Sequence, residues 1–323
     1  MKILPIAAAA MLMVAGCTGN TGKIDVIFDS DANNELDDQH AIAYMLMNNE
    51  TFNVLGITTN VTFGGGGIDE QSAEAERVIS LVGEYGRNAT VIPGATGNFE
   101  QIRPTLSESG FDGDKAVNFI IEKAHSYKPS DKLTLIAVGK LTNVALALEK
   151  APEIAKNIRL IWLGSNYPES GEYNLENDIP SMNYVLDSDI EFEIAMVRYG
   201  KPSGTDAVTI TRDRVKEEIA GRGPKVKEPV TGRHGGEFTC FGDYSLSLFD
   251  NISLGEGGTR ALFDMAAVAV VKNSDWARKE IIPAPVMVDG KWVDRPDNAR
   301  QIGIWVDFDK EAIINDFIST LNK

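Results

Sequence analysis

Cysteine and histidine are scarce in this chain. Its 323 residues include only two cysteines, Cys17 and Cys240, and three histidines. Zinc sites are built mostly from these two residue types, so the composition gives little support to a zinc site. With Cys17 assigned to the N-terminal signal described below, Cys240 has no partner for an intramolecular disulfide. A hard cation held by oxygen atoms fits this set of side chains better.

Positive charge is also in short supply. Lysine and arginine number 31 against 47 aspartates and glutamates, which gives a formal net charge of -16. A surface of this sign repels phosphate backbones, so we expect no nucleic-acid partner. It also concentrates cations near any carboxylate site, although solubility alone is a sufficient reason for such a charge.

The apolar run at the N-terminus is too short to cross a bilayer as a stable helix. It covers residues 3–15 and leads into the sequence Val-Ala-Gly-Cys that ends at Cys17. Small residues before a cysteine resemble the bacterial lipoprotein signal; the alternative is an ordinary signal peptide with a chance cysteine. We expect residues 1–22 to be a lipoprotein signal peptide and tether, with Cys17 as the lipid attachment site. The protein would then be exported and membrane-anchored through its lipid only, in the periplasm or at the cell surface.

From residue 23 onward, short apolar runs alternate with helical patterns. This alternation predicts an α/β fold with an open, mainly parallel (mixed) sheet and helices on both faces. Neither an internal repeat nor a break in composition divides the chain, so residues 23–323 are expected to form one domain. In such sheets the ligand site lies beyond the carboxyl ends of the strands, which directs attention to residues that directly follow a strand.

The expected elements follow from apolar periodicity and turn residues. Strands are predicted at 24–28, 52–58, 89–92, 132–138, 158–163, 191–197 and 301–308, with a hairpin around residues 286–293. Helices are predicted at 39–47, 74–82, 116–124, 141–150, 180–186, 259–271 and 310–321. Residues 62–68, with four consecutive glycines, are expected to form a mobile loop, and residues 200–258 to cover a sheet edge with helices and loops.

The most informative segment is the acidic run between the first strand and the first helix. Residues 29–38 contain five carboxylates in ten residues. Such a group repels itself unless a divalent cation is bound, and calcium prefers six to eight oxygen ligands. The adjacent Asp37 and Asp38 point in different directions, so one can bind metal while the other faces a substrate. The alternative is an acidic loop with aspartates that cap the helix.

Two later groups are weaker signals. Asn166 and the polar run 172–178 follow a predicted strand, and their amides and carboxylates suit the recognition of sugar hydroxyls, although ordinary polar loops look similar. Asp264 is an isolated carboxylate near the start of an apolar helix. A charge there is costly unless it is paired, bound to a metal or placed to interact with the helix N-terminus.

Taken in order, these segments resemble the family of calcium-dependent, inosine-uridine preferring nucleoside N-ribohydrolases. That family opens with a strand that runs into Asp-x-Asp and then Asp-Asp. The matching segments here are Asp29, Asp31, Asp37 and Asp38, then Leu-Gly-Ile-Thr-Thr at 55–59, Gly-x-Leu-Thr-Asn at 139–143, Glu-Tyr-Asn at 172–174, and Asp264. The similarity covers residues 24–323 and implies the family's Rossmann-like fold.

The resemblance also implies a reaction, which is calcium-dependent hydrolysis of the N-glycosidic bond of ribonucleosides or related ribosides to ribose and free base. The metal ligands would be Asp31, Asp38, Asp264 and the backbone carbonyl of Val138. Asp37 would be the general base that takes a proton from the attacking water.

The resemblance assigns roles to further polar residues. Asn166, Glu172 and Asn174 would hold the ribose hydroxyls, and Asp29 would brace the acidic loop. Members of the family are commonly dimers or tetramers, so a homodimer or homotetramer is expected.

The chain departs from the family pattern in its acidic loop. The Asp-Asp pair lies two residues further from Asp31 than in the common form, so residues 33–35 form an insert. An asparagine that follows the second strand in the family is not clearly placed, and Asn60 is the candidate for it.

A second departure concerns the leaving group. Many members have a histidine before the last metal-binding aspartate that helps the base depart, and here that position is Phe263. His234 or Tyr244 could supply a different acid. The alternatives are a calcium-dependent hydrolase of another glycoside and a non-catalytic nucleoside- or sugar-binding lipoprotein.

Overall fold

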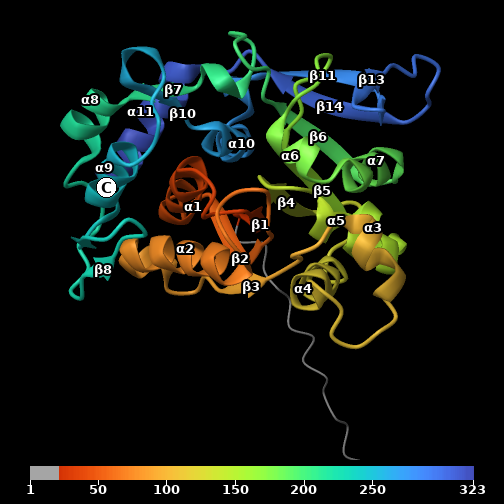
Figure 1. The fold of residues 1–323 in the computed structure, drawn as a ribbon, viewed down its shortest axis with the longest axis horizontal. Helices are drawn as coiled ribbons and strands as arrows, with labels where there is room; N and C mark the ends of the chain where they lie inside the picture. The colour runs from red at the N-terminus through yellow and green to blue at the C-terminus, as the bar shows by residue number, and fades with distance from the viewer. Residues whose placement is uncertain (1–21) are drawn as a thin grey trace, which may run out of the picture.

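The computed structural model describes residues 22–323, and within them the chain is organised around one large mixed sheet (Figure 1). Its strands are β1 (Ile24–Ser30), β2 (Phe52–Thr59), β3 (Val91–Pro93), β4 (Leu133–Ala137), β5 (Ile158–Gly164), β6 (Glu191–Met196), β11 (Arg278–Pro283) and β14 (Gln301–Val306). Their order is β11-β14-β6-β5-β4-β1-β2-β3. All neighbours pair in parallel except β11, which is antiparallel to β14. The predicted α/β fold is confirmed.

Residues 1–21 lie outside the part of the chain that the structure describes. The expected signal peptide and the lipid attachment site at Cys17 fall in that segment. From residue 22 to residue 323, no helix has the length and apolar character needed to cross a membrane.

Helices cover both faces of the sheet. One face carries α1 (Asp37–Met47), α2 (Ile68–Leu81), α10 (Phe263–Lys272) and α11 (Lys310–Leu321). The other carries α3 (Phe99–Ile102), α4 (Asp114–Ala124), α5 (Thr142–Lys150) and α7 (Ile179–Asp187). In β1, Val26 and Phe28 pack into the first layer and Ile27 into the second. Strands buried on both faces explain the continuous apolar runs in the sequence.

Three short strand pairs lie outside the main sheet. They are β7 (Thr209–Thr211) with β10 (Thr259–Ala261), β8 (Val230–Thr231) with β9 (Glu237–Phe238), and β12 (Val286–Val288) with β13 (Lys291–Val293). The last pair confirms the predicted hairpin. The helix predicted at 259–271 was wrong at its start, because residues 259–261 pair with β7 and the helix begins at Phe263.

Residues 200–258 also differ from expectation. They pack over the helical layer rather than over a sheet edge, with β8 against α2 and with α9 (Phe241–Asp250) beside α1 and α11 (Figure 1). The physical reason is aromatic packing. Phe241 and Phe249 of α9 and Phe317 of α11 each make edge contacts with the buried ring of His40 on α1.

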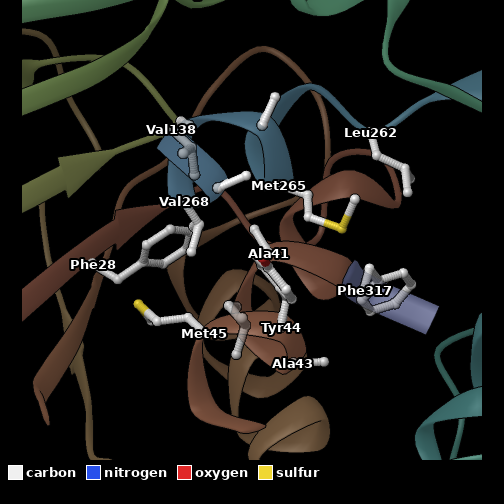
Figure 2. Packing of buried hydrophobic residues seen from close by; sticks show 14 of the residues in the cluster. Phe28, Ala41, Ala43, Tyr44, Met45, Val138, Leu262, Met265, Val268 and Phe317 are labelled. Carbon is white, nitrogen blue, oxygen red and sulfur yellow. The ribbon is translucent and has the colours of Figure 1, made fainter. Parts of the chain in front are cut away.

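Helix α1 packs directly against α10 (Figure 2). Buried side chains fill this contact, with Ala41 on one helix beside Met265 and Val268 on the other. The small side chain of Ala41 lets the two helices approach closely. Phe28 of β1 packs into the same cluster from the side of the sheet. Because the two helices start at the same end of the sheet, this packing brings their first turns together.

Strand β1 lies where the chain reverses its direction across the sheet. From β1 the chain adds β2 and β3 on one side, whereas β4, β5 and β6 extend the other side. The buried carboxylate of Asp29 fastens the end of β1 to both sides. It accepts hydrogen bonds from Thr58 Oγ1 at 2.5 Å, Asn143 Nδ2 at 2.7 Å and Asn60 Nδ2 at 3.0 Å. The carboxyl ends of β1 and β4 thus form the switch point at which such folds bind ligands.

Replacing Asp29 with alanine tests this junction. Each of its three buried donors would lose its acceptor, and each such loss costs about 1–3 kcal/mol, so we expect the free energy of unfolding to fall by about 3–5 kcal/mol. Urea denaturation of residues 22–323 at neutral pH measures it. Asp25→Ala is the matched control on the same strand, because that carboxylate accepts two hydrogen bonds and is only half-buried. Equal losses in both variants would contradict this role of Asp29.

Candidate active site

A cavity of about 370 Å³ opens at the switch point, beyond the carboxyl ends of β1, β4, β5 and β6. Its floor is acidic and is formed by the first turns of two helices. One oxygen from each carboxylate of Asp37, Asp38 and Asp264 lies within 4.8 Å of the others. The first two belong to α1 and the third to α10. Negative side chains are favoured at helix N-termini, so each helix tolerates its own acidic residues.

Hydroxyl groups orient the neighbouring carboxylates. Ser30 Oγ donates to Asp38 Oδ1 at 2.5 Å, and Thr62 Oγ1 donates to Asp31 Oδ2 at 2.5 Å. Asp31 lines the same cavity, but it stands outside the compact group of three. The structure therefore brings the three predicted acidic metal ligands and Asp37, the predicted base, into one cavity. Asp37 belongs to the compact group with Asp38 and Asp264.

Burial of these carboxylates disfavours their charged forms. It raises the pKa of Asp31 to about 6 and the pKa of Asp37 to about 7. Burial, with repulsion between the carboxylates, raises the pKa of Asp38 and the pKa of Asp264 well above their usual range. Four buried carboxylates cannot all be ionised without a compensating positive charge.

The donor set fits a hard divalent cation. All the candidate ligand atoms are oxygens, as calcium and magnesium prefer. The predicted carbonyl ligand, Val138, lines the cavity, and its oxygen accepts a hydrogen bond from Asn174 Nδ2 at 2.7 Å. A carbonyl oxygen has two lone pairs, so this contact leaves one free for an ion.

Two of the predicted ribose-binding residues, Glu172 and Asn174, line the cavity beside the acidic floor. Glu172 precedes the short helix α6 (Tyr173–Asn177), and its carboxylate accepts backbone hydrogen bonds from Ser165, Asn174 and Leu175 at 2.8–3.0 Å. Burial raises the pKa of Glu172 to about 7. The loop after β5 is therefore held rigidly, with both side chains at the cavity wall.

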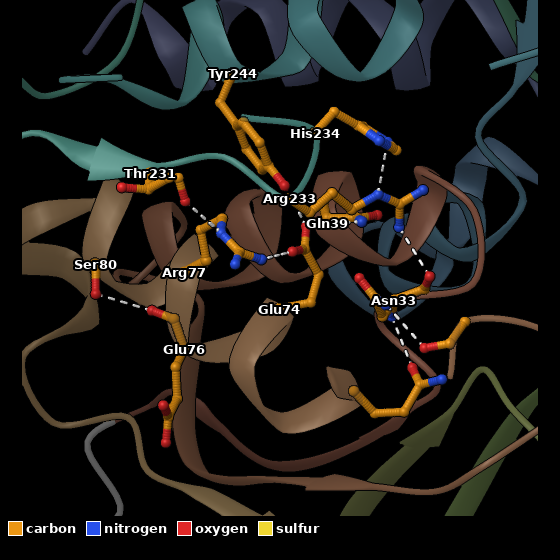
Figure 3. A network of polar contacts seen from close by, with 12 residues as sticks. Asn33, Gln39, Glu74, Glu76, Arg77, Ser80, Thr231, Arg233, His234 and Tyr244 are labelled. Atoms are coloured by element: carbon orange, nitrogen blue, oxygen red, sulfur yellow. Dashed lines mark hydrogen bonds and ion pairs between the residues drawn. The ribbon is translucent and has the colours of Figure 1, made fainter. Parts of the chain in front are cut away.

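Other predicted site residues do not line the cavity. Asn166 accepts a hydrogen bond from Tyr199 N at 2.8 Å and donates to Ser170 O at 3.1 Å, which fixes loop backbone. Asn60 is fully buried and donates to Asp29. His234 is exposed and accepts from Arg233 Nε at 3.0 Å (Figure 3).

Tyr244, the second residue considered as an acid, also lies away from the cavity. Its hydroxyl donates to Glu74 Oε1 at 2.5 Å within a buried network that includes Gln39 and Arg77 (Figure 3). This network joins α9 to α1 and α2, so it supports the layer beneath the site.

The sequence reasoning missed the outer part of the cavity. Tyr199 and Phe263 line it with their rings edge to face at 6.0 Å between centroids. Arg260 and Glu35 line it as an ion pair. Tyr199 lies just past the carboxyl end of β6, so the rule that ligands bind beyond strand ends was a signal that could have found it.

The sequence profile of the inosine-uridine preferring nucleoside hydrolases matches residues 26–315. The chain belongs to this family. It is therefore a hydrolase that acts on N-glycosyl compounds, and the family is metal-dependent.

Individual relatives agree with this assignment. An inosine-uridine preferring nucleoside hydrolase of Leishmania major is 26% identical over 318 residues, covering 88% of this chain and 94% of the relative. Among solved structures, a plant nucleoside hydrolase matches with a TM-score of 0.68 and 18% identity over 93% of this chain and 99% of the other. A purine-preferring ribonucleoside hydrolase from Gardnerella vaginalis matches with a TM-score of 0.66 and 19% identity, covering 92% and 98%. The two structures show that the nucleoside hydrolase fold is shared.

The acidic floor of this nucleoside hydrolase predicts the effect of removing one carboxylate. Asp264→Asn should weaken binding of a divalent cation at least about 100-fold, because even residues that only orient metal ligands contribute about 10–100-fold. Isothermal titration calorimetry with calcium, magnesium and manganese in turn measures this. Asp69→Asn is the matched control, since Asp69 also lies in the first turn of a helix but is exposed. Unchanged affinity in Asp264→Asn would show that the ion binds elsewhere.

Proposed function

We propose that this nucleoside hydrolase uses calcium to cleave the N-glycosidic bond of ribonucleosides or related ribosides, giving ribose and free base. The observation that supports this most directly is the buried acidic floor at the switch point, with Glu172 and Asn174 at the adjacent wall. The floor is suited to a cation and the wall to sugar hydroxyls, so one cavity holds both parts that the reaction needs.

Calcium is proposed over magnesium because of the number of protein ligands, since magnesium usually keeps several waters and binds through only one or two carboxylates. Asp31, Asp38, Asp264 and the Val138 carbonyl offer oxygens only, and substrate hydroxyls and water can complete a coordination number of six to eight. When bound, a divalent cation supplies positive charge that orients oxygen ligands and makes a water easier to deprotonate. It also removes the repulsion among the buried carboxylates.

The side chains of the cavity account for the remaining chemistry. Asp37 takes a proton from the attacking water, whose oxygen forms a bond to the anomeric carbon. Glu172 and Asn174 hold the ribose so that this carbon faces the water, which supplies proximity. As the bond to the base nitrogen breaks, positive charge develops on the sugar ring. The surrounding carboxylates stabilise that charge.

Release of reducing sugar tests the proposed function. Purified residues 22–323 would be incubated with inosine, uridine, guanosine, adenosine and cytidine, with calcium or with a chelator. We expect sugar release that the chelator abolishes and that added calcium restores. Asp37→Asn should lower kcat by about 100-fold or more while ribonucleoside still binds, because general base catalysis contributes about 10²–10⁴-fold.

Two results would count against this function. Absence of sugar release across the panel, with calcium bound, would favour a hydrolase of another glycoside or a non-catalytic nucleoside-binding protein. Sugar release that persists in Asp37→Asn would show that a different group is the base. Glu76→Gln, which removes an exposed carboxylate on α2, is the control for a general effect of charge.

We also propose that the full chain is an exported lipoprotein, which rests on the N-terminal sequence alone. Cys17→Ala should shift the protein from the membrane fraction to the soluble fraction of expressing cells, because no acyl chain can be attached. Cell fractionation with immunoblotting measures this, and Cys240→Ala is the matched control. Retention of Cys17→Ala in the membrane would contradict lipid anchoring. A homodimer or homotetramer, proposed from the family resemblance, can be tested by light scattering.

A further inference from the structure

The outer cavity contains an arginine whose position in the fold is unusual. Arg260 lies on β10, four residues before Asp264, and its side chain is only 22% exposed. Its Nη2 forms an ion pair with Glu35, and its Nε is buried without a hydrogen-bond partner among the described residues. A buried donor without an acceptor is rare in native proteins and calls for an explanation.

Glu35 belongs to the insert formed by residues 33–35, and a second arginine holds the other end of this insert. Arg233 Nη1 donates to the carbonyl oxygen of Asn33 at 2.9 Å (Figure 3). The side chain of Asn33 in turn donates to Gly65 O at 2.8 Å. The insert is therefore fixed at both ends, and the partly exposed side chain of Glu35 forms its ion pair with Arg260.

Two aromatic rings share the cavity with Arg260. Phe263 and Tyr199 line it together, and Phe263 stands where many relatives have a histidine. Flat rings can stack on a planar base, and Tyr199 also carries a hydroxyl that can donate a hydrogen bond. Neither side chain carries the positive charge that would balance the negative charge of a departing base. Arg260 provides a cationic side chain at this wall of the cavity.

We propose that Arg260, positioned by Glu35, contacts the aglycone of the substrate and stabilises the negative charge that develops on it. This role rests on the proposed function. In the step, the electron pair of the broken carbon–nitrogen bond stays on the base nitrogen. The guanidinium donates hydrogen bonds to the departing base and keeps its own proton, because arginine is not deprotonated in proteins. The base then takes a proton from water, which balances the proton that Asp37 removed.

Among the alternatives for this role, Tyr199 lines the cavity but offers only an uncharged hydroxyl, and two other residues are placed less well. His234 is exposed and outside the cavity, and the hydroxyl of Tyr244 is committed to Glu74. The Glu35–Arg260 pair could instead be purely structural and only hold the cavity wall together. An experiment must distinguish this role from a catalytic one.

The dependence of turnover on the leaving group distinguishes a catalytic role of Arg260 from a structural one. Wild type, Arg260→Gln and Arg260→Lys would be assayed with calcium on inosine, on uridine and on 4-nitrophenyl β-D-ribofuranoside, whose nitrophenolate departs without assistance. We expect Arg260→Gln to lower kcat for the nucleosides about 100- to 1,000-fold, the loss seen when one stabilising donor is removed. On the nitrophenyl riboside it should change less than about threefold, and Arg260→Lys should recover part of the nucleoside activity.

Four further measurements complete the test. Glu35→Gln should show the same selective pattern with a smaller loss, and calorimetric calcium affinity should stay within about threefold of wild type in the Arg260 variants. Arg212→Gln, which breaks an exposed ion pair with Asp250, is the matched control and should behave as wild type on all substrates. Thermal unfolding confirms that each variant is folded.

Three results would contradict these proposals, and each has a different meaning. Equal losses on the nucleosides and on the nitrophenyl riboside would identify Arg260 as structural and overturn the proposal. Unchanged nucleoside turnover in Arg260→Gln would overturn it as well, while the proposed function would stand. Failure of the wild type to release sugar from any of the three ribosides would overturn the proposed function and this role together.

Discussion

Mutual repulsion among buried carboxylates is the constraint on which the rest of this structure depends. Asp37, Asp38 and Asp264 meet at the floor of one cavity, and their burial raises the pKa of each group. A hydrogen bond between the side chains of Asp38 and Asp264 offsets only part of this repulsion. The packing of α1 against α10 and the three hydrogen bonds to Asp29 impose the arrangement. The fold thus supplies the free energy that holds a cation site ready.

Much of the fold could be predicted because its signals are local. Strands such as β1 and β4 are buried on both faces and read as continuous apolar runs, and the acidic loop lies within ten residues of sequence. The edge strand β11 was missed because its first three residues, Arg278–Glu280, are charged, as residues of edge strands commonly are. Residues 259–261 were assigned to a helix because their pairing with β7 depends on a segment far away in the chain.

The site residues also differ in whether a local sequence signal predicts them. The acidic loop after β1 and the ribose wall after β5 lie beyond strand ends, so a rule about strand ends finds them. Asp264 was found differently, as an isolated carboxylate in an apolar helix. The ion pair of Arg260 and Glu35 could not be found in this way, because the two residues meet only through tertiary structure. Neither residue is unusual in its own sequence context. The departures noted in the sequence, the insert at 33–35 and Phe263, nevertheless mark the cavity wall where this pair lies.

The separation of the acidic residues along the chain has a consequence for assembly. Asp37 follows the first strand, whereas Asp264 belongs to the last third of the sequence. A bound ion would therefore link an early segment of the chain to a late one. Its full affinity would be reached only after α10 had packed against α1. Ion binding and tertiary closure would be thermodynamically linked, so the concentration of free cation around the protein would set its resistance to unfolding.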